Sequence, residues 1–211
     1  MEASLGKEGI LKNIRKALIQ SADQPFPGIE KIDFAFEKGE DDLSIQFAEK
    51  FTSLLGRFSF CENEEDLVNQ LLALVEERGW TEIHCADENI KSALSSFGFP
   101  AFSEKQLADV DVSITKCEVL VARTGSMVLS STESSGRLSS VYAPIHICIA
   151  KTNQLVHDVK DAIVFMQKKY GDRLPSMISF ATGPSRTADI EKTLVVGVHG
   201  PKEVYCFLLD K

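Results

Sequence analysis

The sequence has no closely spaced cysteines. Its five cysteines are scattered and none belongs to a C-x-x-C pair: Cys61, Cys85, Cys117, Cys148 and Cys206. Iron–sulfur clusters need clustered thiolates, so we expect this chain to hold no cluster of its own. Scattered cysteines within apolar segments are typical of reduced, buried thiols in a cytoplasmic protein, which is the location we expect.

Several other signatures are missing. No stretch is long enough to span a bilayer, and lysines interrupt the apolar residues near the N-terminus, so we expect neither a membrane anchor nor a signal peptide. The glycine-rich nucleotide patterns and the G-x-S-x-G motif are absent, which weighs against a kinase, a dinucleotide-binding dehydrogenase and a serine hydrolase. No histidine pair has metal-ligand spacing, so we expect no metal site.

Positive charge is scarce, since 31 acidic residues outnumber 23 basic ones and the net charge is -8. Surfaces that bind nucleic acid or anionic lipid are usually basic, so neither is an expected partner. An anionic ligand would have to be met by local positive groups. The hydrophobic content of 44% is typical of a globular fold.

Alternating strand and helix patterns predict an α/β fold with a mostly parallel sheet flanked by helices. The Thr-Gly-Ser turn at 124–126 leaves no room for a helix, so a hairpin or bent strand is expected there. Strands are predicted at 57–61, 81–85, 112–122, 126–130, 145–149, 177–181, 194–198 and 204–209, with helices at 63–79, 90–97 and 156–170.

Residues 1–56 are expected to form a helical extension to an α/β domain at 57–211. Apolar residues recur at helical spacing within 5–20 and again within 42–55. These helices could cap the main domain or pack on another subunit, so a homo-oligomer stays open.

Three polar loops adjoin predicted strands, and each contains one arginine. Ligands of open α/β sheets bind at loops beyond the carboxyl ends of strands, so these loops could form a pocket for a carboxylate or phosphate. The alternative is three separately solvated turns. The candidate ligand-binding residues are Arg123, Thr124, Gly125, Ser126, Arg137, Gly183, Ser185, Arg186 and Thr187.

Catalytic roles are open, with Asp189, Glu191 and His199 as candidates. Carboxylates and an imidazole could exchange protons near neutral pH. His199 is flanked by glycine and proline, so it could equally be a turn residue. We expect His146 to be a structural residue within a strand, and His157 to lie on a helix surface.

Two segments resemble motifs of the lactate utilisation protein C family, whose LUD domain also occurs in its iron–sulfur partner, protein B. The first is Gly-Pro-Ser-x-Thr-x-Asp-Ile-Glu at 183–191, followed by Gly-Val-His-Gly-Pro at 197–201. The second is Thr-Gly-Ser at 124–126, within a resemblance that covers roughly 60–210. Family members usually carry glutamate where Arg123 stands, so no catalytic carboxylate is expected there.

The resemblance implies the superfold of sugar-phosphate isomerases, glucosamine-phosphate deaminases and coenzyme A transferases. It also implies a component of a system that oxidises L-lactate to pyruvate, with iron–sulfur clusters in partner proteins and no cofactor in this chain. Two alternatives stay open. One is an independent enzyme acting on a phosphorylated or acyl-activated small molecule, and the other is a regulatory or scaffolding module.

Overall fold

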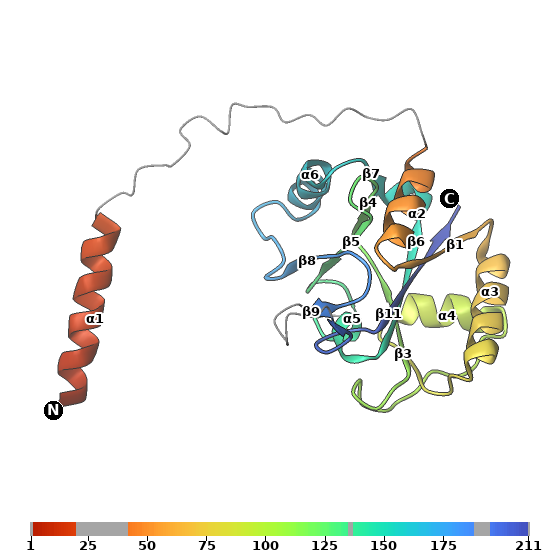
Figure 1. The fold of residues 1–211 in the computed structure, drawn as a ribbon, viewed down its shortest axis with the longest axis horizontal. Coiled ribbons are helices and arrows are strands. Elements are labelled where there is room, and N and C mark those ends of the chain that lie inside the picture. Colours follow the sequence, from red (N-terminus) through yellow and green to blue (C-terminus); the bar gives the residue numbers. More distant parts are fainter. Residues whose placement is uncertain (1, 20–41, 135–136, 188–194, 211) are drawn as a thin grey trace. The chain divides into compact units, whose positions relative to one another are not determined.

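The computed structural model describes residues 2–19, 42–134, 137–187 and 195–210 (Figure 1). Contacts divide the chain into two units, Met1–Glu37 and Lys38–Lys211. Among the helices of the described residues, none is long and apolar enough to cross a bilayer.

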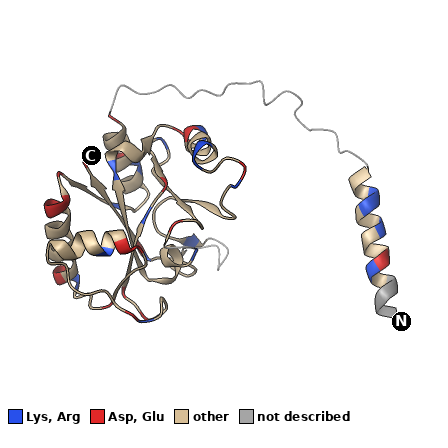
Figure 2. Cartoon of the chain, turned by 180° about the vertical axis from the view of Figure 1, so that it is seen from behind, with Lys and Arg blue, Asp and Glu red and all other residues tan. Residues whose placement is uncertain are grey.

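The first unit contains one described helix, α1 (Glu2–Ile19), which confirms the helix expected at 5–20. Its apolar stripe is exposed, with Ile10 at 62%, Ile14 at 48% and Leu18 at 79%. Basic residues recur along the same helix (Figure 2). α1 is therefore amphipathic and displays its apolar side chains.

The second unit is built on a five-stranded parallel sheet with the order β1-β11-β6-β3-β2. Central β6 pairs with both neighbours, so that Ile147 lies between Ile114 and Tyr205. This arrangement confirms the predicted mostly parallel sheet. The strands are β1 (Arg57–Cys61), β2 (Ile83–Cys85), β3 (Val112–Lys116), β6 (Ile145–Lys151) and β11 (Glu203–Leu209).

Two helices cover one face of this sheet, α3 (Glu64–Arg78) and α4 (Glu88–Ser96). Asn63 caps α3 by accepting a hydrogen bond from the N–H of Asp66, and Gly79 ends it with a φ of 65°. Because α3 joins β1 to β2, the connection passes over the three strands between them (Figure 1). Two helices thus cover a five-stranded face.

A second sheet has the order β7-β4-β5-β8. The segment 112–122, predicted as one strand, divides because the chain leaves the first sheet after β3 and enters the second at β4. β4 and β5 pair in antiparallel fashion, which confirms the hairpin at 124–126. The strands are β4 (Val119–Val121), β5 (Ser126–Ser130), β7 (Leu155–Val156) and β8 (Ile178–Ala181).

The remaining elements pack around these two sheets. α6 (Val159–Tyr170) lies against β4 and β7, and α5 (Ser139–Tyr142) lies against β3 and β6. β9 (Arg186–Thr187) and β10 (Val195–Val196) form a small antiparallel pair.

Helix α2 (Leu43–Ser53) belongs to the core of the second unit. Its Phe47 and Phe51 are fully buried, and their rings stack with centroids 5.3 Å apart. They pack with Leu120, Met127 and Cys206. The sequence predicts α2 as part of a helical extension at 1–56. In the structure, its Phe47 and Phe51 are buried in the core cluster that contains residues of both sheets.

All five cysteines are buried and free. Cys117, Cys148 and Cys206 pack in the same cluster as α2, although they are far apart in the sequence. Hydrogen bonding to Cys148, together with burial, raises the pKa of Cys117 well above its ordinary value. Such a thiol is protonated and unreactive at neutral pH.

Candidate functional site

The Thr-Gly-Ser turn packs against the end of α2. Gly125 has a φ of 62°, and a Cβ there would lie 2.6 Å from the backbone nitrogen of Phe51. The hydroxyl of Ser126 lies 2.8 Å from that of Thr124 and 2.7 Å from that of Thr182. The turn therefore joins α2 to the loop after β8, and its hydroxyls hydrogen-bond to one another.

Arg123 joins the end of β4 to the start of α6. One guanidinium nitrogen lies 2.7 Å from Oδ1 of Asp158, the residue that caps α6. This contact lowers the pKa of the Asp158 carboxyl. The backbone N–H of Arg123 donates to the carbonyl of His157, which is buried. The prediction that His157 lies on a helix surface was wrong, because His157 is buried and α6 begins after it, at Val159.

The other two predicted arginines lie elsewhere. Arg137 donates to the hydroxyl of Ser176, ahead of β8. Arg186 is exposed on β9, opposite Val196. The described contacts of Arg123, Arg137 and Arg186 thus lead to different parts of the unit, and ligand binding by them stays a prediction. Asp189 and Glu191 lie outside the described residues.

The two motif segments that follow β8 and β10 meet through backbone hydrogen bonds. The N–H of Ser185 donates to the carbonyl of Pro201 at 3.0 Å, and the N–H of Gly197 donates to the carbonyl of Ser185 at 2.9 Å. A cavity of about 260 Å³, here called the motif cavity, lies beside them. It brings together Gly183, Ser185 and His199 among the predicted residues, and it is also lined by His146.

His146 is the buried polar group of the motif cavity. Its Nε2 lies 2.8 Å from the hydroxyl of Thr115 on the neighbouring strand, and only 1% of the residue is exposed. Burial lowers the pKa of His146 to about 4, so the ring is neutral near pH 7. Ser113, its register neighbour, has a buried hydroxyl without a hydrogen-bond partner among the described residues.

His146 is predicted from the sequence to be a structural residue of its strand. A signal was nevertheless present, because Ser113, Thr115 and His146 occupy alternate positions of two apolar strands. Alternating polar residues in strands covered on both faces must share one buried face. That pattern predicts a polar layer inside the domain.

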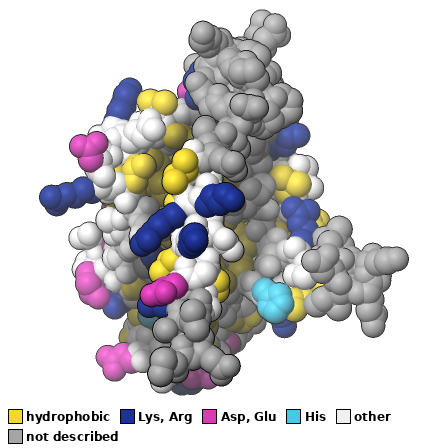
Figure 3. Space-filling view, turned by 90° about the vertical axis from the view of Figure 1, so that its left-hand side faces the viewer, with side chains coloured by type: hydrophobic (Ala, Val, Ile, Leu, Met, Phe, Trp, Pro, Cys, Tyr) yellow, Lys and Arg dark blue, Asp and Glu magenta, His cyan; other side chains and the backbone are white. Residues whose placement is uncertain are grey.

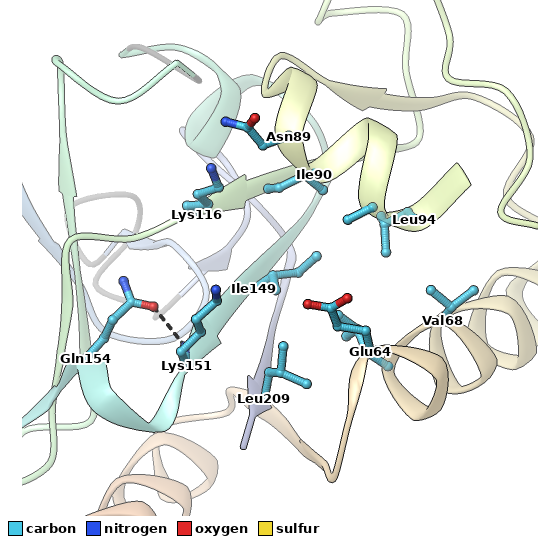
Figure 4. A pocket seen from close by; sticks show the side chains of 12 residues that line it. Glu64, Val68, Asn89, Ile90, Leu94, Lys116, Ile149, Lys151, Gln154 and Leu209 are labelled. Atoms are coloured by element: carbon cyan, nitrogen blue, oxygen red, sulfur yellow. Dashed lines mark hydrogen bonds between the residues drawn. The ribbon is translucent and has the colours of Figure 1, made fainter. Parts of the chain in front are cut away.

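A second cavity lies at the carboxyl ends of the parallel strands, between α3 and α4 (Figure 4). Its volume is about 180 Å³, and we call it the edge pocket. Lys116 and Lys151 end β3 and β6 beside it. Sequence reasoning missed these residues because they are 35 positions apart and belong to no motif. The polar side chains are Glu64, Asn89, Lys116, Lys151 and Gln154; the apolar ones are Leu67, Val68, Ile90, Ala93, Leu94, Ile149 and Leu209.

In the part of the chain that the structure describes, no three His, Cys, Asp or Glu side chains are grouped so that they could hold a metal ion.

The sequence profile of the LUD domain matches residues 45–209. The chain belongs to the LUD domain family. The match begins inside α2, which agrees with the packing of this helix in the core. The LUD domain thus includes both sheets, the motif cavity and the edge pocket.

Two relatives of this LUD chain are each named Lactate utilization protein C. The protein from Shouchella clausii is 40% identical over 111 residues, which cover 52% of this chain and 48% of that protein. The protein from Bacillus subtilis is 37% identical over 110 residues, covering 51% and 46%. The chain therefore spans about half the length of these relatives.

A solved structure has the same LUD fold. It is a DUF162 family protein from Deinococcus radiodurans, with a TM-score of 0.59 and 17% identity. The match covers 82% of this chain and 99% of that one. At this identity the likeness shows the fold alone, and it supports the α/β assignment.

Proposed function

We propose that this chain is a component of a lactate utilisation system that oxidises L-lactate to pyruvate in the cytoplasm. The observation that carries the proposal is the 37–40% identity to two proteins named Lactate utilization protein C. Both matches cover only about half of this chain and half of each relative. The oxidation reaction and the iron–sulfur partners are therefore part of what we propose for this chain. Iron–sulfur proteins would carry the electrons, and this chain would act beside them.

In this proposal the motif cavity holds the small acid. A neutral imidazole and a serine hydroxyl can each donate or accept a hydrogen bond, as the hydroxyl and carboxylate of a 2-hydroxy acid require. His146 and Ser185 both line this cavity and supply these groups. Arg186, next to Ser185 in the sequence, is the candidate partner of the carboxylate.

A subunit that works with partners needs a surface to bind them. α1 carries exposed apolar residues together with Lys12, Arg15 and Lys16 in a chain of net charge -8. Figure 3 shows basic side chains in dark blue and apolar ones in yellow among the surface atoms that it colours. Exposed apolar stripes bordered by polar residues are typical of protein-binding surfaces, so we assign partner binding to α1.

Growth of a deletion strain tests this proposal. Cells without the gene are expected to grow poorly on L-lactate and normally on pyruvate, and the full chain should restore growth on L-lactate. Tagged chain purified from lactate-grown cells should bring down proteins that contain iron and acid-labile sulfide. Normal growth of the deletion strain on L-lactate, without such proteins in the pull-down, would contradict the proposal.

The same purified chain can test the independent enzyme that the sequence left open. Turnover of a sugar phosphate or a coenzyme A ester by the chain alone, with normal growth of the deletion strain on lactate, would favour that alternative. The motif cavity would then be the first place to search for its catalytic groups.

A further inference from the structure

The edge pocket results from the topology of the parallel sheet. α3 packs on β1 and β11, and α4 packs on β2, so the carboxyl half of β6 lies between the two helices. Ile149 and Lys151 of β6 line the pocket there. Crevices at the carboxyl ends of parallel strands are where open α/β sheets bind ligands.

The walls of the edge pocket are aliphatic. Ile90 and Leu94 of α4, Val68 of α3, and Ile149 and Leu209 of the sheet point toward the same space (Figure 4). A volume of about 180 Å³ lies below the range of roughly 300–1,000 Å³ that is typical of sites for drug-sized ligands. The pocket therefore suits a small, mostly apolar group.

The charges around the pocket compensate one another. Nζ of Lys116 lies 2.7 Å from Oδ2 of Asp87, which is buried at the start of α4. Lys151 and Glu64 add one charge of each sign. A small anion would have to compete with the Asp87 carboxylate that already pairs with Lys116, so a ligand without net charge is favoured.

The polar groups are nevertheless fixed in place and can form hydrogen bonds. The Gln154 amide donates to the carbonyls of Cys117 at 2.7 Å and Glu118 at 3.2 Å, and its Oε1 accepts from the N–H of Lys151 at 2.8 Å. Gln154 therefore offers a ligand the remaining lone pair of its Oε1, as an acceptor. Asn89, which is exposed in the first turn of α4, carries both a donor and an acceptor. A matching ligand has donors and acceptors at one edge and an apolar body.

We propose that the edge pocket binds a neutral nitrogen heterocycle of one or two rings, the class that includes nucleobases and pyridine carboxamides. The ring lies among the aliphatic walls, and its polar edge meets Asn89, Gln154 and the lysine ammonium groups. This site is separate from the motif cavity, and it does not depend on a role in lactate oxidation.

Methyl NMR of the full chain tests the proposal with two ligands that have the same ring but differ in charge. Nicotinamide is neutral, and nicotinate has the same ring with a negative charge. Nicotinamide should cause saturable shifts in the methyl groups of Ile90, Leu94 and Ile149 at millimolar concentration, and nicotinate should bind at least about tenfold more weakly. This comparison needs no variant.

A pair of alanine substitutions locates the binding. Ala93→Phe would place a ring in the pocket from an exposed position of α4, and Ala73→Phe makes the same change at an exposed position of α3 that lines a different cleft. The first should weaken nicotinamide binding at least about tenfold, and the second should leave it unchanged. Equal binding of nicotinate, no methyl shifts, or shifts confined to Leu129 and Val204 in the motif cavity would overturn the proposal.

Discussion

Glu118, between β3 and β4, places its Oε2 2.7 Å from the Nζ of Lys169 near the end of α6. The carboxylate also accepts hydrogen bonds from Tyr170 and Ser130. Burial alone would raise the pKa of Glu118, but the three donors outweigh it and hold that pKa below its ordinary value. The buried carboxylate thus fixes α6 to the point where the chain passes between the sheets.

Replacement of Lys169, the cation that pairs with Glu118, should destabilise the fold. Lys169→Met would leave the buried carboxylate of Glu118 without its counter-charge, and we expect the free energy of unfolding to fall by about 1–3 kcal/mol. The loss is smaller than for a fully buried pair because the Lys169 side chain is 43% exposed. Urea denaturation measures it. Lys168→Met, at the neighbouring exposed position, is the control and should change stability little; equal effects of the two would contradict the assignment.

A glycine of the family motif is required by a close approach of α2. Gly183 has a φ of 72°, and a Cβ there would overlap the carbonyl oxygen of Leu54. Gly79 has a similar φ of 65° but nothing within 4 Å of its Cβ position. Gly79→Ala should therefore cost about 1 kcal/mol for the backbone conformation alone, and Gly183→Ala clearly more. Thermal unfolding of both variants gives the difference, and similar costs would show that α2 can move aside.

Most of the fold could be predicted from local patterns in the sequence. Asn63 and Gly79 mark the two ends of α3, and alternating strand and helix patterns indicate the parallel sheet. The division of 112–122 between two sheets could not be predicted, because no glycine or proline interrupts this segment at Cys117 and Glu118. The position of α2 in the core likewise depends on tertiary packing of Phe47 and Phe51, since an apolar stripe does not specify what covers it.

The candidate site could be predicted in part. The sequence motifs at 183–191 and 197–201 singled out Gly183, Ser185 and His199 as candidates. All three residues line the motif cavity. The participation of His146 depends on strand order, because β6 lies next to β3 only in the folded sheet. The edge pocket was missed for the same reason: Lys116 and Lys151 end neighbouring strands that are distant in the sequence.

The buried carboxylate of Asp87 should make stability depend on pH. Burial would raise the pKa of Asp87, but hydrogen bonds from Lys116, Ser134 and the N–H of Ile90 lower it from 3.8 to about 2. A depressed pKa contributes stability that is complete above about pH 4 and is lost as the pH falls through about 2. Asp87→Asn should therefore be about 2 kcal/mol less stable than wild type at pH 7, and the gap should close toward pH 2.

Urea denaturation at pH 7, 4 and 3 checks the prediction for Asp87. Asp109→Asn, at an exposed position, is the control and should give a small difference at every pH. A gap for Asp87→Asn that stays constant from pH 7 to pH 3 would show that the cap acts through shape and not through charge.

If α1 binds the partners, a substitution in α1 should weaken partner binding without destabilising the second unit. Ile14→Gln would remove the centre of the exposed apolar stripe without changing the charge of the helix. We expect iron–sulfur proteins to co-purify at least about tenfold less, while the melting temperature stays within about 1 °C. Asn13→Gln, at an exposed polar position of α1, changes neither the apolar stripe nor the charge and should retain the partners. Partner recovery that is unchanged in Ile14→Gln would exclude this stripe.

Ligand binding beside the motif cavity can be measured by thermal shift. A ligand that binds only the folded state stabilises it, by about 2.7 kcal/mol at a concentration of 100 times its Kd. We expect a small carboxylate such as L-lactate to raise the melting temperature of the wild type, and Arg186→Ala to lose most of this shift because the cation that meets the carboxylate is gone. Arg186 is exposed, so its removal should leave the ligand-free melting temperature nearly unchanged.

The control is Arg173→Ala, also at an exposed position, which should keep the full thermal shift. A shift that persists in Arg186→Ala would remove this arginine from the site and leave His146 and Ser185 as the groups to substitute next.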